Sequence, residues 1–145
     1  MTEPKEINYI DLELMEKMCH PLAVALFDSG IDPITHFSKH NKARLESALS
    51  NPKWSFYPTF TQKAAILYYG LVKGHCFENG NKRTATAALL VFLHINNFWI
   101  DGRKREIEDY LVDLAKRVAS SEGNRQMSDF LAEIDEWLNK HINVI

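Results

Sequence analysis

Apolar residues recur every three or four positions along most of the chain, which is the spacing of an amphipathic helix. The pattern predicts helices over about 11–27, 42–49, 81–95, 104–120 and 128–141. A further helix starts after Thr59 or Thr61, either of which can cap it, and ends at Gly74. Only the region around Trp54 and residues 98–100 leave room for short strands. We therefore expect an all-α helical bundle with residues 1–145 forming a single domain.

Two of these segments have features that shape the bundle. The first segment places Leu14, Met15, Met18, Leu22 and Leu26 on one face. Its Pro21 is expected to kink or split the helix near His20, and Asp28-Ser29-Gly30 to end it, before a turn at Asp32-Pro33. The segment 81–95 is apolar nearly all round, which is typical of a buried central helix.

Composition narrows the classes of protein that this chain can be. The 145 residues are 46% hydrophobic, and 17 basic against 19 acidic side chains give a net charge of −2. A near-neutral chain does not favour direct nucleic-acid binding. The two cysteines, Cys19 and Cys76, have neither the number of a disulfide framework nor the spacing of a zinc site. We therefore expect the protein in a reducing compartment. Acidic residues near the N-terminus argue against a signal peptide, and no apolar run reaches the ~20 residues of a membrane helix. These features predict a soluble, cytoplasmic protein.

Polar chemistry is concentrated in the segment between two predicted helices, residues 75–83. Free N–H groups at the start of the helix that follows, together with its dipole, form an anion site. Gly80 has no Cβ, so a phosphate can approach its backbone, and it can adopt a positive φ. Lys82 and Arg83 lie in the first turn, where the dipole disfavours cations unless an anion lies among them. Arg83 can bind a phosphate through two hydrogen bonds.

The remaining residues of the segment complete a candidate phosphate site. Asn81 can cap the helix or donate its amide to a phosphate oxygen, and Phe77 is a candidate hydrophobic anchor for the loop. Histidine ionises near neutral pH, so His75 is a candidate general base. Each residue taken alone also has a plain structural interpretation: a surface histidine, an Asn79-Gly80 turn, or a solvated Lys-Arg pair. Together they favour a phosphate-binding loop.

The same segment resembles the signature of the Fic/Doc superfamily, with His75 first, Phe77 two positions later, then an amide, a small residue and Asn81. Its ending, Asn81-Lys82-Arg83-Thr84-Ala85, resembles the Doc branch, because the Fic branch usually has glycine at the position of Lys82. The stretch Leu45–Leu49 followed by Pro52 is similar to a helix upstream of the motif in that family.

The resemblance implies an all-helical enzyme that transfers part of a nucleotide to a hydroxyl group of a target protein. Doc-branch toxins are kinases that move the γ-phosphate of ATP to a threonine of the bacterial elongation factor Tu and so inhibit translation, whereas Fic enzymes transfer AMP. By resemblance, His75 deprotonates the acceptor hydroxyl, and Gly80, Asn81 and Arg83 hold phosphates. Lys82 obstructs the nucleotide pose needed for AMP transfer and favours a flipped one.

Three further expectations follow from the resemblance. The family commonly binds Mg²⁺ through Asp or Glu at the position of Asn79, where an amide oxygen is a weaker ligand. The family's inhibitory Ser/Thr-x-x-x-Glu-Gly/Asn motif is missing, since Glu122-Gly123 has Val118 four residues earlier, and control is therefore expected from a cognate antitoxin helix in a groove of the bundle. Trp54 and Phe56 lie in the stretch that corresponds to the family's target flap, in which these alternate side chains pack inward while the edge accepts a target segment; a loop that only covers the core is an equal alternative.

Two other functions stay open at this point. One is a Fic-like AMP transferase. The other is a catalytically silent binding module, which the neutral Asn79 favours.

Overall fold

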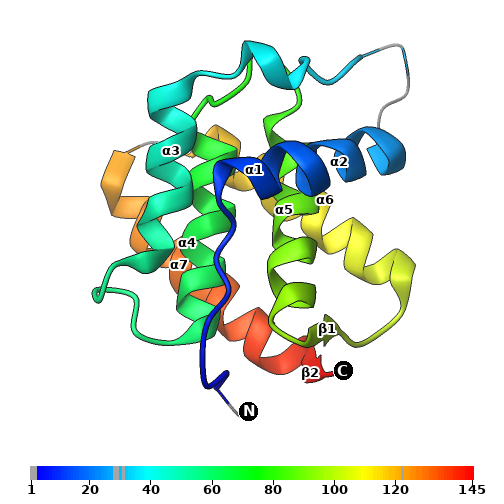
Figure 1. Cartoon of the computed structure of the whole chain (residues 1–145). Helices are drawn as coiled ribbons and strands as arrows, with labels where there is room; N and C mark the ends of the chain where they lie inside the picture. Colours follow the sequence, from blue (N-terminus) through cyan, green and yellow to red (C-terminus); the bar gives the residue numbers. More distant parts are fainter. Residues whose placement is uncertain (1–2, 28–29, 31, 122) are drawn as a thin grey trace.

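Helices α4 and α5 stand side by side at the centre of the computed structural model, which describes residues 3–27, 30, 32–121 and 123–145 (Figure 1). The helices are α1 (Leu12–Leu14), α2 (His20–Phe27), α3 (Lys42–Ser50), α4 (Phe60–Lys73), α5 (Asn81–Ile95), α6 (Lys104–Ser120) and α7 (Gly123–His141). A π-helical turn (Met15–Cys19) joins α1 to α2, and 3-10 turns lie at Phe37–Lys39 and Asn51–Lys53. The strands are β1 (Phe98–Ile100) and β2 (Ile142–Val144). The expected all-α fold is confirmed.

The central pair of helices is held by capping at one end and by packing along its length. Thr59 accepts from the Gln62 backbone N–H while the Gln62 side chain accepts from the Thr59 N–H, a capping box that starts α4. The ring of Phe60 stacks on Phe92 of α5 and on Phe98 of β1, with centroids 5.0 and 4.9 Å away. All three side chains are buried. These stacks fix the far end of α5, so the position of its first turn is fixed as well.

Helices α6 and α7 cover one side of the central pair, and an ion pair joins them to each other. Both are amphipathic, and their buried residues are Leu111, Leu114, Ala115, Val118, Ile134 and Leu138. Arg117 of α6 donates to both carboxylate oxygens of Glu133 on α7, each at 2.8 Å. Strand β2 pairs antiparallel with β1, so the C-terminal end of the chain lies at the lower end of α5 in Figure 1.

The first helical segment differs from the prediction in which face it buries. Met18 and Leu26, expected in the core, are 42% and 54% exposed, whereas Cys19 and Ala23 are fully buried. The cause is the π-helical turn Met15–Cys19, which contains Met18 and precedes Leu26, because its wider i→i+5 bonding changes the faces of the residues within and after it relative to an unbroken α-helix. Pro21 splits the segment at His20 as expected, but the change in register was not anticipated.

Other boundaries follow the sequence with two exceptions. Helix α7 begins at Gly123, five residues before the predicted start at Ser128, because its first turn is polar and carries no apolar periodicity. The region around Trp54 forms turns, and of the two proposed strand sites only 98–100 is a strand. Asp28 and Ser29 of the expected helix stop, and Glu122, lie outside the described residues. In the described part, no helix is long and apolar enough to cross a membrane.

The aromatic stack around α5 carries much of the fold's stability. Replacing Phe92 by alanine is expected to lower the free energy of unfolding by about 3–5 kcal/mol, because it removes a fully buried ring and leaves a cavity. Denaturant unfolding measures the loss. The exposed Val112→Ala change on α6 is the control and should stay within about 0.5 kcal/mol of the native protein. A Phe92→Ala protein of near-native stability would contradict this assignment of the core.

Candidate functional site

The loop that links α4 to α5 lies at the upper end of the central pair (Figure 1), and part of this loop lines a pocket. This pocket has a volume of about 940 Å³, and its lining includes His75 and every residue from Glu78 to Arg83. It continues past the motif loop along α5, between α6 and the end of α2, as far as Trp99 and Ile100. The structure thus brings the candidate base and the candidate phosphate-binding residues to one cavity.

His75 is exposed and has an uncommon backbone conformation. Its φ is +51°, in the left-handed region that non-glycine residues rarely adopt. Such a conformation persists only where neighbouring structure enforces it, and it is frequent at functional sites. The neighbour on its C-terminal side supplies the constraint: Cys76 is buried, and its carbonyl accepts a 2.7 Å hydrogen bond from the Asn41 N–H.

Cys76 lies next to the candidate base but is unsuited to act as a nucleophile. Burial raises the pKa of its thiol to about 11, with the Arg44 charge acting in the opposite direction. At neutral pH the side chain is therefore a thiol, and the reactive form of cysteine is the thiolate. His75 remains the candidate for proton transfer in this loop.

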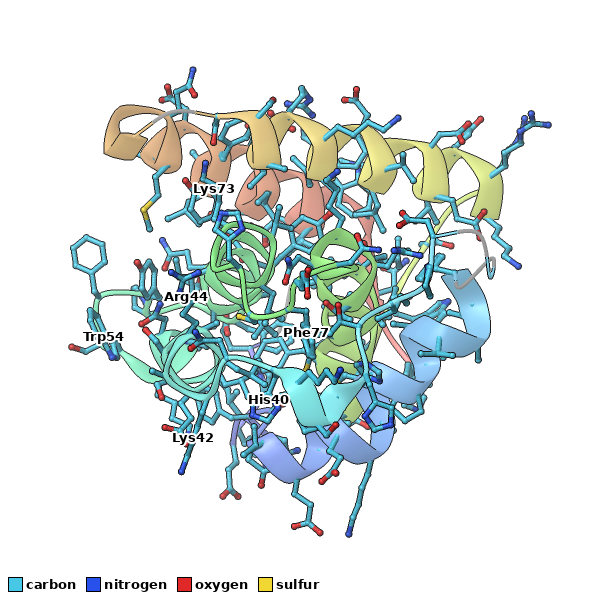
Figure 2. The ribbon with its side chains drawn as sticks, turned by 90° about the horizontal axis from the view of Figure 1, so that it is seen from above. His40, Lys42, Arg44, Trp54, Lys73 and Phe77 are labelled. Carbon is cyan, nitrogen blue, oxygen red and sulfur yellow. The ribbon has the colours of Figure 1, made fainter. Side chains whose placement is uncertain are left out.

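The loop is anchored through Phe77, which is only 3% exposed. Its ring lies against those of His20, Phe37 and His40, at centroid distances of 5.5, 6.1 and 6.4 Å. Figure 2 shows Phe77 and His40 near the middle of this end of the molecule. The Asn81 amide holds the same residue from the other side, accepting from the Phe77 N–H at 3.0 Å and donating to its carbonyl at 2.8 Å. The Asn81 side chain is thus committed to the loop, and Asn81 also lies on the pocket lining.

Helix α5 starts from a glycine in the left-handed conformation. Gly80 has φ +95°, and the first helical hydrogen bond is donated to its carbonyl by the Thr84 N–H. The N–H groups of residues 81–83 precede that bond and have no partner within the helix. A Cβ at Gly80 would lie 2.8 Å from Ile34 Cγ2. The Cβ side of Gly80 is therefore filled by Ile34, so the absence of a side chain serves close packing and backbone shape, while Gly80 stays on the pocket lining.

The two cations of the first turn lie in different surroundings. Lys82 is exposed and lines the pocket without a recorded ion pair among the described residues. Arg83 also lines the pocket, but its Nη1 donates to the Asp32 carbonyl at 2.6 Å, and its Nη2 lies 3.4 Å from Asp32 Oδ2. Arg83 is thus held by an internal partner, and Lys82 is available to an incoming anion.

Sequence reasoning missed the segment that holds this loop in place, Asp32–Thr35. The Asn79 N–H donates to Thr35 Oγ1 at 2.7 Å, and the Thr35 N–H donates to the Asn79 carbonyl at 3.1 Å. The Asn79 amide also donates to Asp32 Oδ1 at 2.6 Å and to the Pro33 carbonyl at 2.8 Å. Asp32-Pro33 is a turn signal more than 40 residues before the loop, and nothing in its local pattern indicates this contact.

The residues near Asn79 include side-chain oxygens of the kind that bind a hard cation. Among the described residues, no group of three or more His, Cys, Asp or Glu side chains could hold a metal ion. Mg²⁺ usually takes only one or two protein ligands and keeps substrate phosphates and water as the others. Asn79 and Glu78 carry side-chain oxygens on the lining of one pocket, which fits that mode of binding, and the Asp32 carboxylate contacts the Asn79 amide beside them.

The aromatic segment after α3 does not have the predicted arrangement. Trp54 and Phe56 were expected to pack inward, yet they are 59% and 79% exposed and are absent from the pocket lining. Figure 2 places Trp54 at the edge of the molecule, away from Phe77. The segment forms turns and does not extend, because the buried Lys63 ammonium donates hydrogen bonds to the carbonyls of Pro52 and Trp54, at 2.9 and 3.5 Å.

Comparison with known proteins places this site in a family. The model of the Fic/DOC family matches residues 9–93, which include the whole loop from His75 to Arg83. The protein named Toxin Doc from Mycolicibacterium smegmatis (strain ATCC 700084 / mc(2)155) is 36% identical over 80 residues. That alignment spans 50% of this chain and 62% of the relative's length. Because the family match covers more than half of the chain, the chain belongs to the Fic/DOC family.

The fit of Gly80 against Ile34 gives a direct test of the loop. Gly80→Ala is expected to destabilise the protein by about 2–4 kcal/mol, because the new Cβ meets Ile34 and the left-handed backbone disfavours alanine. Gly30→Ala is the matched control, since Gly30 also has a positive φ, of +77°, but has no atom within 4 Å of its Cβ position. Thermal unfolding of both variants measures the difference. Equal losses would show that the contact with Ile34 has no importance.

Proposed function

We propose that this chain is a Doc-like toxin that transfers the γ-phosphate of ATP to a threonine or serine hydroxyl of a target protein. The observation that carries the proposal is the shared pocket, in which an exposed histidine lies with the first turn of α5 and its two cations. The family match and the relative named Toxin Doc support the same conclusion. By the same resemblance, the target is elongation factor Tu, and its modification would stop translation in the bacterial cytoplasm.

For phosphate transfer, the protein mainly has to position the two substrates and neutralise the charge of the phosphates. His75 accepts the proton of the acceptor hydroxyl as that oxygen forms a bond to the γ-phosphorus, and the bond from this phosphorus to the β–γ bridging oxygen breaks, so ADP leaves with the electron pair. The N–H groups of residues 81–83 and the Lys82 ammonium stabilise the phosphate oxygens. Mg²⁺, when bound beside Asn79, neutralises charge on the same phosphates.

The identity of the transferred group separates this function from its nearest alternative. Lys82 stands at the start of α5, where its bulk and charge favour a pose that presents the terminal phosphate. An AMP transferase would instead form its new bond to the α-phosphorus and release pyrophosphate.

Isotope transfer with a catalytic variant tests the proposal. The purified protein is expected to move label from the γ-position of ATP, and none from the α-position, onto elongation factor Tu. His75→Ala should reduce the rate by at least about 100-fold, because a general base contributes factors of this size. His94→Ala, an exposed histidine in the last turn of α5, is the control and should leave the rate unchanged. Transfer of α-label would support the AMP transferase, and growth arrest that survives His75→Ala would support the silent binding module.

The exposed aromatic residues of the segment 53–57 are the proposed contact for the target protein. Trp54 and Phe56 present large apolar side chains to solvent, and the Phe56 ring packs edge-on against Tyr57. Exposed aromatic groups of this kind are typical of interaction sites.

The long arm of the pocket is the proposed site of a cognate antitoxin. Beyond the motif loop its lining is mainly apolar and comes from α2, α5 and α6: Leu26, Phe27, Leu90, Ile107, Leu111, Val112, Ala115 and Ala119. Helix α5 alone is about 22 Å long at 1.5 Å per residue, so the arm suits an amphipathic helix laid beside it. Such a helix would end next to His75 and Arg83 and block the nucleotide.

A charged side chain in this arm should weaken the binding of the antitoxin and leave the rate of phosphate transfer unchanged. Val112→Glu is expected to lower the affinity for the co-encoded antitoxin by at least tenfold and to leave uninhibited phosphate transfer unchanged. Val144→Glu is the matched control, because Val144 is also an exposed valine but lies on β2, outside this pocket. Binding titration measures both variants. Equal antitoxin affinity for Val112→Glu and the native protein would place the antitoxin elsewhere.

A further inference from the structure

The side-chain amide of Asn79 is held in one orientation by two acceptors. Its Nδ2 lies 2.6 Å from Asp32 Oδ1 and 2.8 Å from the Pro33 carbonyl oxygen. A carboxylate and a carbonyl have no hydrogen to donate, so the group that faces them must be the NH₂ end of the amide. Both of its hydrogens are used by these two bonds. The orientation of this amide therefore follows from the chemistry of its neighbours.

The consequence is that Asn79 offers an oxygen to the pocket. A carboxamide carries its oxygen on the side opposite the NH₂ group, and in the described part of the chain no hydrogen bond is recorded for Asn79 Oδ1. Asn79 lines the pocket with the start of α5. A phosphate oxygen would need a donor from this residue, whereas a hard divalent cation needs an oxygen. The fixed amide thus suits a cation that accompanies the phosphates.

The Asp32 carboxylate makes a shorter hydrogen bond with Asn79 than with Arg83. Its bond to the Asn79 amide is 2.6 Å, whereas its carboxylate lies 3.4 Å from Arg83 Nη2. The strong bond to Arg83, 2.6 Å from Nη1, comes from the Asp32 backbone carbonyl. That bond is independent of the residue type at position 32. Removing the side chain should therefore take one of the two acceptors from the Asn79 amide, which leaves it held by the Pro33 carbonyl alone, and keep Arg83 largely in place.

We propose that Asp32 is a positioning residue that orients the Asn79 amide, so that its oxygen receives the Mg²⁺ ion carried by the nucleotide. This role rests on the proposed function, because it requires a metal–nucleotide in the pocket. Asp32 does not contact the reacting atoms. It hydrogen-bonds to Asn79, the residue that would bind the metal ion. The loss of such a hydrogen-bonding partner behind a metal ligand typically weakens metal binding by 10- to 100-fold.

The segment that carries Asp32 stays attached without its side chain. Thr35 exchanges two hydrogen bonds with Asn79, and the neighbouring Ile34 is buried against Ala23 and Ala87. Asp32 itself is exposed. Asp32→Ala is therefore expected to fold, and Asp32→Asn keeps a side-chain oxygen that can accept from Asn79.

The test is the binding of a fluorescent ATP analogue to the full chain, measured once with Mg²⁺ and once with EDTA. The native protein should bind more tightly with Mg²⁺. Asp32→Ala should reduce this enhancement by about tenfold and leave the EDTA affinity within about twofold. Asp32→Asn should retain most of the enhancement. Asp109→Ala is the control: it also removes an exposed carboxylate from the pocket lining, but it lies on α6, away from Asn79 in the sequence and without a recorded contact with it among the described residues.

A double variant identifies the residue through which Asp32 acts. Asn79→Ala should lose the same Mg²⁺ enhancement, and adding Asp32→Ala to it should change nothing further. The inference is overturned if Asp32→Ala keeps the enhancement, if it weakens binding equally in EDTA, or if Asp109→Ala loses as much. A native protein that binds the analogue in neither condition would instead remove the proposed function itself.

Discussion

The candidate site depends on the hydrogen bonds that join Asn79 to the segment Asp32–Thr35. Four bonds converge on this one residue, two through its backbone and two through its amide. They hold the loop against a part of the chain that lies more than 40 residues away in the sequence. Because the loop leads directly into the first turn of α5, the same bonds determine where the N–H groups of residues 81–83 point. A loose loop could not present those groups, His75 and Lys82 to one substrate.

A second constraint comes from the other side of the loop. Phe77 is buried among rings from α2 and the 3-10 turn at Phe37–Lys39, and the Asn81 amide holds the Phe77 backbone in both directions. Between these two attachments, Gly80 takes a left-handed conformation that lets α5 begin beside Ile34. The stability of the bundle and the geometry of the site are therefore linked, since the aromatic packing that fixes α5 also fixes its first turn.

Much of this arrangement could be predicted from local pattern. The period of apolar residues located α4, α5 and α6, and the motif from His75 to Arg83 stood out because packing does not require so many polar groups before an apolar helix. The contacts of Asp32 could not be predicted, because a turn signal says nothing about which distant loop it touches. The exposure of Met18 and Leu26 was missed because the π-helical turn changes which residues share a face, and the spacing of apolar residues does not indicate such a turn. Trp54 and Phe56 were misplaced because the buried Lys63 ammonium donates hydrogen bonds to the carbonyls of Pro52 and Trp54, and the local sequence pattern does not indicate these bonds.

The central claim is that the terminal phosphate of a nucleotide binds at the start of α5 beside His75. A crystal structure of the protein with Mg²⁺ and a non-hydrolysable ATP analogue tests it most directly. The account predicts the γ-phosphate within hydrogen-bonding distance of the N–H groups of residues 81–83, with the His75 ring facing the acceptor side. A nucleotide bound with its α-phosphate beside His75, or bound outside this pocket, would contradict it.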